Sequence, residues 1–258
     1  MFVTLAYNMC ANVLRAIGDS MTPLIFLILA AVLNVILDYV CILVFSMGVG
    51  GAAAATVISQ VVSVVLCVIH IKRHFPILQV ERRHFKLEKS EVRTMLSGGL
   101  SMGMMSSLVN LGTLALQTSI NRLGRDIIVA HTAARKITEM FMIMFGVFGQ
   151  TMAIFCGQNA GAGRMDRVRH GIGLAVLYTC IWSVMTVIFS FTIGKQLIYL
   201  VTGSHNETVI RNAANYLKFD TIFYFVTAVI SVLRNAMQGL GETVIPLVSS
   251  ALEMIGKV

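Results

Sequence analysis

Long apolar stretches run through the sequence, and each ends at a short group of charged or turn-forming residues. Asp38 is the only Asp, Glu, Lys or Arg between Asp19 and Lys72, and residues 94–121 contain none. A helix needs about 20 apolar residues to cross a bilayer core about 30 Å thick. The pattern therefore predicts six complete membrane-spanning helices. Their expected ranges are about 21–46, 51–71, 95–120, 128–155, 171–194 and 212–233.

The overall composition agrees with this pattern. Of the 258 residues, 57% are hydrophobic and 12% are charged, whereas a soluble domain carries about 25% charged residues. The five cysteines are far apart, which argues against a disulfide framework or a metal cluster. No catalytic or metal-ligand spacing stands out, so we expect no enzyme. The predicted fold class is all-α, a polytopic helical membrane protein.

Two shorter apolar runs lie at the ends of the chain, at residues 1–14 and 243–258. As helices they reach about 21 Å and about 24 Å, which is less than the thickness of a bilayer core. They are either short interfacial or re-entrant segments, or parts of spans that the given sequence cuts. We favour the second interpretation.

The segment 72–93 is strongly basic and supplies half of the net charge of +8. A basic loop between apolar spans is typical of the cytoplasmic side of a membrane. With this orientation, the cytoplasmic turns and their edges, Arg234 included, carry 12 basic residues, and the opposite side carries seven. No second basic or aromatic surface accompanies the loop, so we expect contact with a lipid bilayer and none with nucleic acid.

An internal repeat appears when the chain is shifted on itself by 223 residues. The shift gives seven identities in 23 positions, and Asp19 meets Glu242 within a shared Gly-acidic-hydroxyl-x-x-Pro turn. The identical pairs are Phe2 with Phe225, Val3 with Val226, Thr4 with Thr227, Asn12 with Asn235, Gly18 with Gly241, Pro23 with Pro246 and Leu24 with Leu247. Both turns fall on the same predicted side of the membrane, which indicates a parallel repeat. A repeat of this period predicts a parent protein about twice as long.

Asp38 is the polar residue with the clearest functional meaning. An ionised carboxylate in hydrocarbon is costly unless it is paired, hydrated or protonated. Asn34 lies four residues earlier and therefore on the same helical face. A carboxylate beside an amide oxygen suits a proton or a small hard cation. Alternatively, Asp38 lies near the outer end of its span and only caps or hydrates it.

Five segments resemble the multidrug and toxic compound extrusion (MATE) transporters, in the order that this family shows. They are Leu14–Pro23 (LRAIGDSMTP), Leu33–Asp38 (LNVILD), Gly50–Gln60 (GGAAAATVISQ), Gly157–Arg164 (GQNAGAGR) with Asp166 and Arg167, and Met237–Glu242 (MQGLGE). The resemblance implies a fold of twelve helices in two lobes, with this chain starting in the fourth helix and ending in the eleventh. It places the end of the N-terminal lobe at 1–71, a cytoplasmic linker at 72–94 and the C-terminal lobe at 95–258.

The resemblance also implies a function. A MATE-like protein is a secondary-active exporter that exchanges protons or sodium for drugs or organic cations by alternating access, without any other cofactor. It implies a multi-pass monomer in the plasma (inner) membrane and adds Thr56 to the cation-coupling residues Asn34 and Asp38. A further family carboxylate on the first helix falls outside this chain. The alternatives are a lipid-linked saccharide flippase of the same superfamily and an inactive transporter remnant.

The span 95–120 carries a polar stripe at steps of three and four residues, which places its members on one helical face. The stripe consists of Ser106, Asn110, Thr113, Gln117 and Asn121. These residues line a substrate cavity, or they join helices by hydrogen bonds. The stripe contains no acid and Asp220 lies near the outer end of its span, so the sequence shows no carboxylate for a cation site in the second lobe.

The span 128–155 opens with charged residues and continues with a cluster of soft apolar ones. Glu139 is placed to pair with Arg135 or Lys136 on the same face. The Met and Phe residues that follow form either a pocket wall or simply lipid and core contacts. They are Met140, Phe141, Met142, Met144, Phe145 and Phe148. Gly157 and Gly161 form a small-xxx-small pattern that favours close helix packing.

Overall fold

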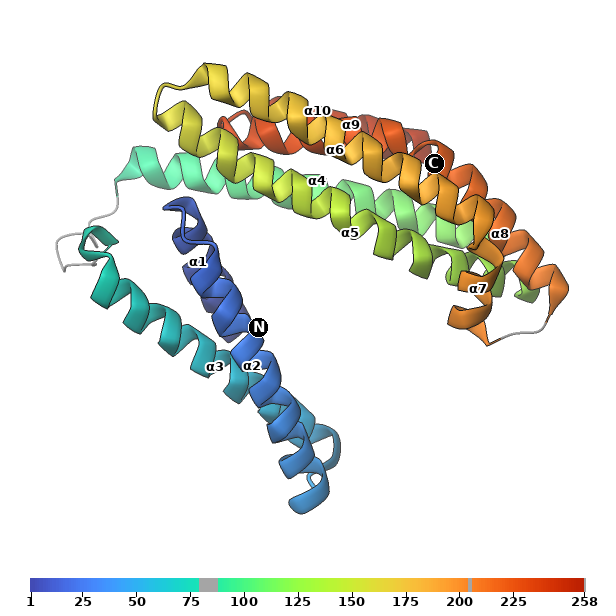
Figure 1. The fold of residues 1–258 in the computed structure, drawn as a ribbon, viewed down its shortest axis with the longest axis horizontal. Helices are drawn as coiled ribbons and strands as arrows, with labels where there is room; N and C mark the ends of the chain where they lie inside the picture. The colour runs from blue at the N-terminus through green and yellow to red at the C-terminus, as the bar shows by residue number, and fades with distance from the viewer. Residues whose placement is uncertain (79–87, 204–205, 258) are drawn as a thin grey trace. The chain divides into compact units, whose positions relative to one another are not determined.

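The computed structural model describes residues 1–78, 88–203 and 206–257. Regular structure in these ranges is helical throughout, and the chain divides into two compact units, Met1–Leu87 and Glu88–Val258 (Figure 1). Five helices in the described ranges are long and apolar enough to cross a membrane, and a bent pair of helices brings the number to six if the pair is counted as one span. The prediction of an all-α, multi-pass membrane protein is confirmed.

The first unit is built from three helices. They are α1 (Phe2–Ala16), α2 (Met21–Tyr39) and α3 (Gly48–His74), with a π-helix η1 (Val40–Val44) after α2 and a 3-10 helix η2 (Pro76–Leu78) after α3. Both α1 and α2 pack against α3. Tyr7, Ala11 and Leu14 of α1 are buried together with Cys67 of α3. The Tyr7 hydroxyl donates a hydrogen bond to the carbonyl of Pro23 over 2.9 Å, which ties α1 to the start of α2.

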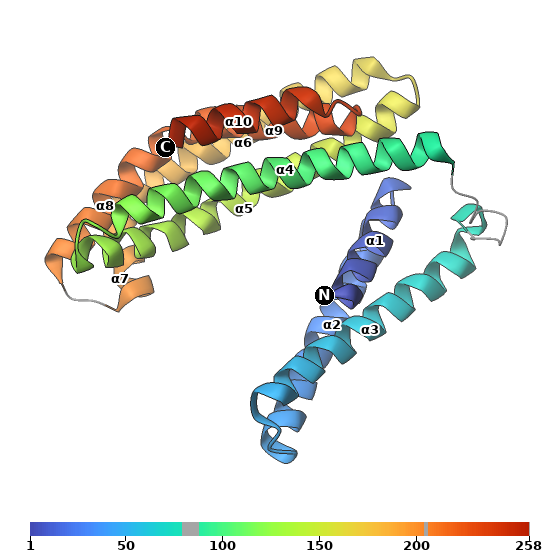
Figure 2. The same cartoon turned by 180° about the vertical axis from the view of Figure 1, so that it is seen from behind.

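The second unit contains the remaining seven helices of the described chain. They are α4 (Lys89–Ile120), α5 (Arg125–Gly161), α6 (Met165–Thr192), α7 (Gly194–Thr202), α8 (Glu207–Ile222), α9 (Tyr224–Gly239) and α10 (Val244–Lys257). The long helix α5 packs against α6, α8 and α9, while α4 lies along α10 (Figure 2). This arrangement places α4, α5, α9 and α10 around one cavity of the unit.

The six predicted spans correspond to helices of the structure, with differences at their ends. The basic loop predicted at 72–93 is shorter, because α3 continues to His74 and α4 already begins at Lys89. Glu91 in the first turn of α4 complements the positive end of the helix dipole. Residues 79–87 of that loop lie outside the described residues. The short helix α7 was not predicted, since no span-length apolar run marks it.

The span predicted at 212–233 is not one straight helix. It consists of α8 and α9, which meet at an angle of 50° next to Phe223. Just before the bend, the Thr221 hydroxyl donates to the carbonyls of Leu217 and Lys218. Such back-bonding by threonine often bends helices. The Asp220 carboxylate also accepts hydrogen bonds from Thr138 of α5 at 3.0 Å and Tyr224 of α9 at 2.9 Å, which hold the bend.

The two turns related by the internal repeat have the same local conformation. Gly18 begins the first turn with φ +96° and Gly241 begins the second with φ +85°, values that glycine adopts without steric cost. The acid that follows each glycine then caps the next helix. The Asp19 carboxylate accepts from the backbone N–H of Thr22 at 3.0 Å, and the Glu242 carboxylate accepts from that of Val244 at 2.9 Å. The repeat found in the sequence is therefore present in the structure of the turns.

Asp19 makes this first turn sensitive to acid. Burial raises the pKa of its carboxyl, but the hydrogen bonds from Thr22 and the nearby His70, at 3.3 Å, outweigh burial and lower the pKa below its usual value. Because the pKa is lower in the folded state, the ionised carboxylate stabilises the fold at pH values above the unfolded pKa of about 3.9. This stabilisation is lost as the pH falls through the folded pKa. We expect Asp19→Asn to melt at a temperature that falls less between pH 6 and pH 3 than that of the wild type.

The measurement is thermal unfolding followed by circular dichroism in detergent at several pH values. Asp166→Asn is the matched control, because Asp166 is an exposed acid in the first turn of α6. The control is expected to keep the wild-type pH dependence. An unchanged pH dependence in Asp19→Asn would contradict the role given to this carboxylate.

Candidate functional site

The structure brings together two of the three predicted cation-coupling residues. Asn34 lies on α2 and Thr56 lies on α3, and the amide Nδ2 of Asn34 donates to the hydroxyl of Thr56 over 3.4 Å. The Thr56 hydroxyl in turn donates to the carbonyl of Ala52 at 3.0 Å. Because Asn34 uses its nitrogen in this contact, its amide oxygen is left as a possible cation ligand.

Asp38 lies one helical turn beyond Asn34 and remains apart from this contact. Its carboxylate oxygen Oδ1 is buried and has no hydrogen-bond partner within the described part of the chain. The π-helix η1 begins two residues later, and π-helical turns are frequent at functional sites. A buried carboxylate oxygen without a donor is costly, and a proton or a cation would remove that cost.

A small cavity of about 200 Å³ lies next to Asn34 and Thr56. Its polar lining consists of Tyr7, Asn34, Thr56, Ser59, Gln60 and Ser63. Gln60 also accepts a hydrogen bond from Thr4 of α1 at 2.6 Å. The volume of this cavity is below the range of about 300–1,000 Å³ that holds drug-sized ligands, so the cavity fits an ion or water.

Gln60 was not singled out among the predicted site residues. It lies four residues after Thr56 on α3 and therefore on the same face. This spacing is a signal in the sequence that could have added it to the candidate set.

The predicted polar stripe on α4 forms one helix face, whose side chains are exposed or half-buried in the second unit. Within it, the Gln117 amide donates to Asn121 at 2.9 Å, and the Thr113 hydroxyl donates to the carbonyl of Val109 at 3.0 Å. Ser106 and Asn110 are exposed. Cavity lining by this stripe stays a prediction.

A cavity with a volume of about 720 Å³ lies in the second unit between α4, α5, α9 and α10. This volume is in the range of sites for drug-sized molecules. Met142 and Phe145, from the predicted Met and Phe cluster, line it together with Met105 of α4. Met140 of the same cluster is 65% exposed instead, so the cluster contributes both to the cavity and to the outer surface.

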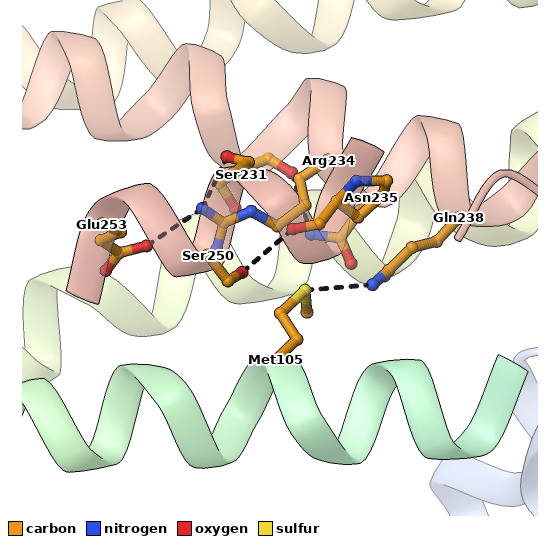
Figure 3. A network of polar contacts seen from close by, with 9 residues as sticks. Met105, Ser231, Arg234, Asn235, Gln238, Ser250 and Glu253 are labelled. Atoms are coloured by element: carbon orange, nitrogen blue, oxygen red, sulfur yellow. Dashed lines mark hydrogen bonds and ion pairs between the residues drawn. The ribbon is translucent and has the colours of Figure 1, made fainter. Parts of the chain in front are cut away.

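An ion pair crosses the wall of this second-unit cavity. The guanidinium Nη2 of Arg234 on α9 lies 3.0 Å from the Glu253 carboxylate on α10 and 3.2 Å from the hydroxyl of Ser249 (Figure 3). The sequence analysis placed Arg234 at the edge of a cytoplasmic turn. The structure shows its side chain to be 14% exposed and part of the cavity lining.

Two further charged groups have clear partners in the second unit. Arg135 and Glu139 form the predicted ion pair on α5, 3.1 Å apart and partly exposed. Asp220 lies at the bend between α8 and α9, held by Thr138 and Tyr224. These contacts stabilise the helix arrangement. The residues that make them are not among those that line the second-unit cavity.

Comparison with known proteins agrees with this architecture. A family model described as MatE matches residues 102–257. The chain is 29% identical over 235 residues to the "Probable multidrug resistance protein YpnP" of Bacillus subtilis (strain 168), covering 91% of this chain and 52% of that protein. It is 25% identical over 244 residues to the "Multidrug export protein MepA" of Staphylococcus aureus (strain N315), covering 92% and 53%.

Solved structures show the same fold at low sequence identity. An outward-facing conformation of a multidrug resistance MATE family transporter matches with a TM-score of 0.87 at 20% identity, over 99% of this chain and 57% of that chain. A MOP superfamily transporter from Pyrococcus furiosus matches with a TM-score of 0.88 at 20% identity, over 98% and 57%. The chain spans about half the length of the curated relatives it matches. Since the family model covers more than half of the residues, the chain belongs to the MatE family of multidrug and toxic compound extrusion transporters.

Proposed function

We propose that this protein is part of a secondary-active multidrug exporter, which moves organic molecules, organic cations among them, out of the cell in exchange for protons or sodium ions. The observation that carries the proposal is the buried Oδ1 of Asp38, which has no hydrogen-bond partner in the described chain. The names of the relatives YpnP and MepA support the export of drugs. The proposal places the protein in the plasma membrane with residues 72–93 in the cytoplasm.

Asp38, Asn34 and Thr56 form the coupling site in this proposal. They offer a carboxylate, an amide oxygen and a hydroxyl, which are the oxygen ligands that a small hard cation prefers. A proton would act on Asp38 alone, while sodium would draw on all three oxygens. An ion moves the conformational equilibrium of a transporter only when it binds one state more tightly than the other. A carboxylate that lacks a hydrogen-bond partner in one conformational state meets this condition, because neutralising its charge with an ion stabilises that state more than a state in which the carboxylate has a partner.

A flippase for lipid-linked saccharides is the second candidate from the same superfamily. Such a protein is expected to line its cavity with several basic residues that bind phosphate. In the described part of the second-unit cavity, the basic lining residue is Arg234, and Glu253 faces it. One basic residue that is paired with an acid falls short of the several phosphate-binding residues expected of a flippase, which favours the drug exporter.

The test is dye efflux from cells or proteoliposomes that contain the full-length protein. We expect efflux of a cationic fluorescent dye to start when an inward proton or sodium gradient is imposed and to stop when that gradient is collapsed. Efflux that depends on ATP alone, or the absence of efflux under both gradients with protein present in the membrane, would contradict the proposal.

A further inference from the structure

On the α9 side of the second-unit cavity, the hydrogen-bond donors of Arg234 are only partly used. The guanidinium of Arg234 carries five N–H donors. Its hydrogen bonds to described residues are donated by Nη2, and its Nε is buried without a partner among these residues. One turn further along α9, the amide nitrogen of Gln238 points at the sulfur of Met105 over 3.5 Å (Figure 3). A thioether sulfur is a weak acceptor. Two neighbouring donors therefore lack a strong acceptor.

The same cavity is also lined by apolar side chains. Met105, Met142, Phe145 and Leu252 line it. Methionine repacks easily around molecules of different shape, and an aromatic ring adds a large apolar contact. A ligand that fits this cavity has an apolar body and one end rich in acceptors.

Glu253 supplies only part of what Arg234 can bind. A carboxylate and a guanidinium form their strongest contact as a fork, with two parallel N–H···O bonds. Here Glu253 reaches Nη2 and leaves Nε unused. The side chain of Glu253 is 35% exposed, against 14% for Arg234, so the guanidinium is the more deeply buried partner in the wall.

From these observations we infer that the second-unit cavity binds amphipathic organic anions, whose carboxylate or sulfonate group is held by Arg234 at Nε and Nη2. The Glu253 carboxylate occupies part of this anion position when no ligand is bound. The apolar body of the ligand lies against Met105, Met142 and Phe145. This inference rests on the proposed exporter and extends its substrates from organic cations to anions.

Equilibrium dialysis of the full chain in lipid nanodiscs tests the inference with two probes that share one ring system, 2-naphthoate and 2-naphthylmethylammonium. Empty nanodiscs correct for partition into lipid. We expect 2-naphthoate to bind at least about tenfold more tightly than the ammonium probe, since a charged hydrogen bond of this kind is worth at least that factor. Equal affinities, or tighter binding of the ammonium probe, would overturn the inference.

Three variants separate anion binding from a purely structural ion pair. Arg234→Gln is expected to weaken 2-naphthoate binding about tenfold or more, and Arg234→Lys to weaken it less, because lysine keeps the charge and loses the fork. Glu253→Gln is expected to strengthen 2-naphthoate binding about tenfold, because the competing charge is removed. Arg211→Gln, an exposed position on α8, is the matched control and is expected to bind like the wild type. If Arg234→Gln fails to fold, the opposite shifts in the other two variants decide the question.

Unchanged 2-naphthoate affinity in Arg234→Lys and Glu253→Gln would show that the pair only joins α9 to α10, and would overturn the inference. The assay uses no ion gradient, so it is independent of the coupling mechanism. Anion binding without gradient-driven efflux would contradict the proposed exporter alone, and efflux without anion binding would contradict this inference alone.

Discussion

Replacing Asp38 by asparagine is expected to abolish gradient-driven efflux by the full-length protein while leaving its amount in the membrane unchanged. Asparagine has nearly the same shape as aspartate, so the packing of α2 against α3 is kept. It carries no charge and cannot exchange a proton, so neither a proton nor sodium gains much by binding next to it. Because the buried Oδ1 of Asp38 has no partner to lose among the described residues, the substitution is expected to have little effect on the fold.

The measurement is dye efflux under an imposed gradient, with the amount of protein determined in isolated membranes. Asp126→Asn is the matched control, because Asp126 is an exposed acid in the first turn of α5. It is expected to export dye at the wild-type rate. Efflux at the wild-type rate in Asp38→Asn would remove this residue from the coupling mechanism.

Two substitutions next to Asp38 refine this expectation. Thr56→Val removes the hydroxyl that Asn34 binds but keeps the side-chain volume. If sodium is the coupling ion, the variant is expected to need a higher sodium concentration for half-maximal efflux, because one oxygen ligand is missing. If the proton is the coupling ion, efflux by the variant is expected to keep its dependence on pH.

The membrane spans could be predicted from the sequence because their signal is local. Charges are absent over the length of a bilayer, and the turns that separate the spans carry glycine, proline and charged residues. The bend next to Phe223 could not be predicted in this way. Part of what holds it is the hydrogen bond from Thr138 of α5 to Asp220, two residues that lie 82 positions apart in the chain.

The residues of the candidate sites were likewise predictable only where the signal is local in the sequence. Asn34 and Asp38 are one turn apart on one helix, so their shared face follows from spacing, and the resemblance to the MATE family added Thr56. Arg234 and Glu253 are separated by 19 residues and the α9–α10 turn. Their pairing depends on how α10 folds back beside α9, and the sequence analysis therefore assigned Arg234 to a loop edge by its charge alone.

The close approach of α5 and α9 provides the largest expected effect on stability. A Cβ atom added to Gly239 would lie 2.8 Å from the Cα of Ala153 and would also overlap the carbonyl oxygen of Ala153. At Gly157 the corresponding Cβ would lie 3.1 Å from the carbonyl oxygen of Gly239, whereas Gly161 has open space around it. The predicted close packing is thus present at Gly157 and absent at Gly161. Because backbone atoms are what the added methyl would meet, no side-chain rotation can relieve the contact.

We therefore expect Gly239→Ala to destabilise the fold by about 1–3 kcal/mol, the usual cost of overpacking a well-packed interior. Gly161→Ala is the matched control, since Gly239 and Gly161 are the last residues of α9 and α5. Alanine restricts the unfolded chain more than glycine does, so the control is expected to be neutral or more stable by about 0.5–1 kcal/mol. Unfolding of the purified chain in mixed micelles with increasing SDS, followed by circular dichroism, gives both values. If the two variants unfold at the same SDS fraction, α5 and α9 lie further apart in the membrane than the contact between Gly239 and Ala153 requires.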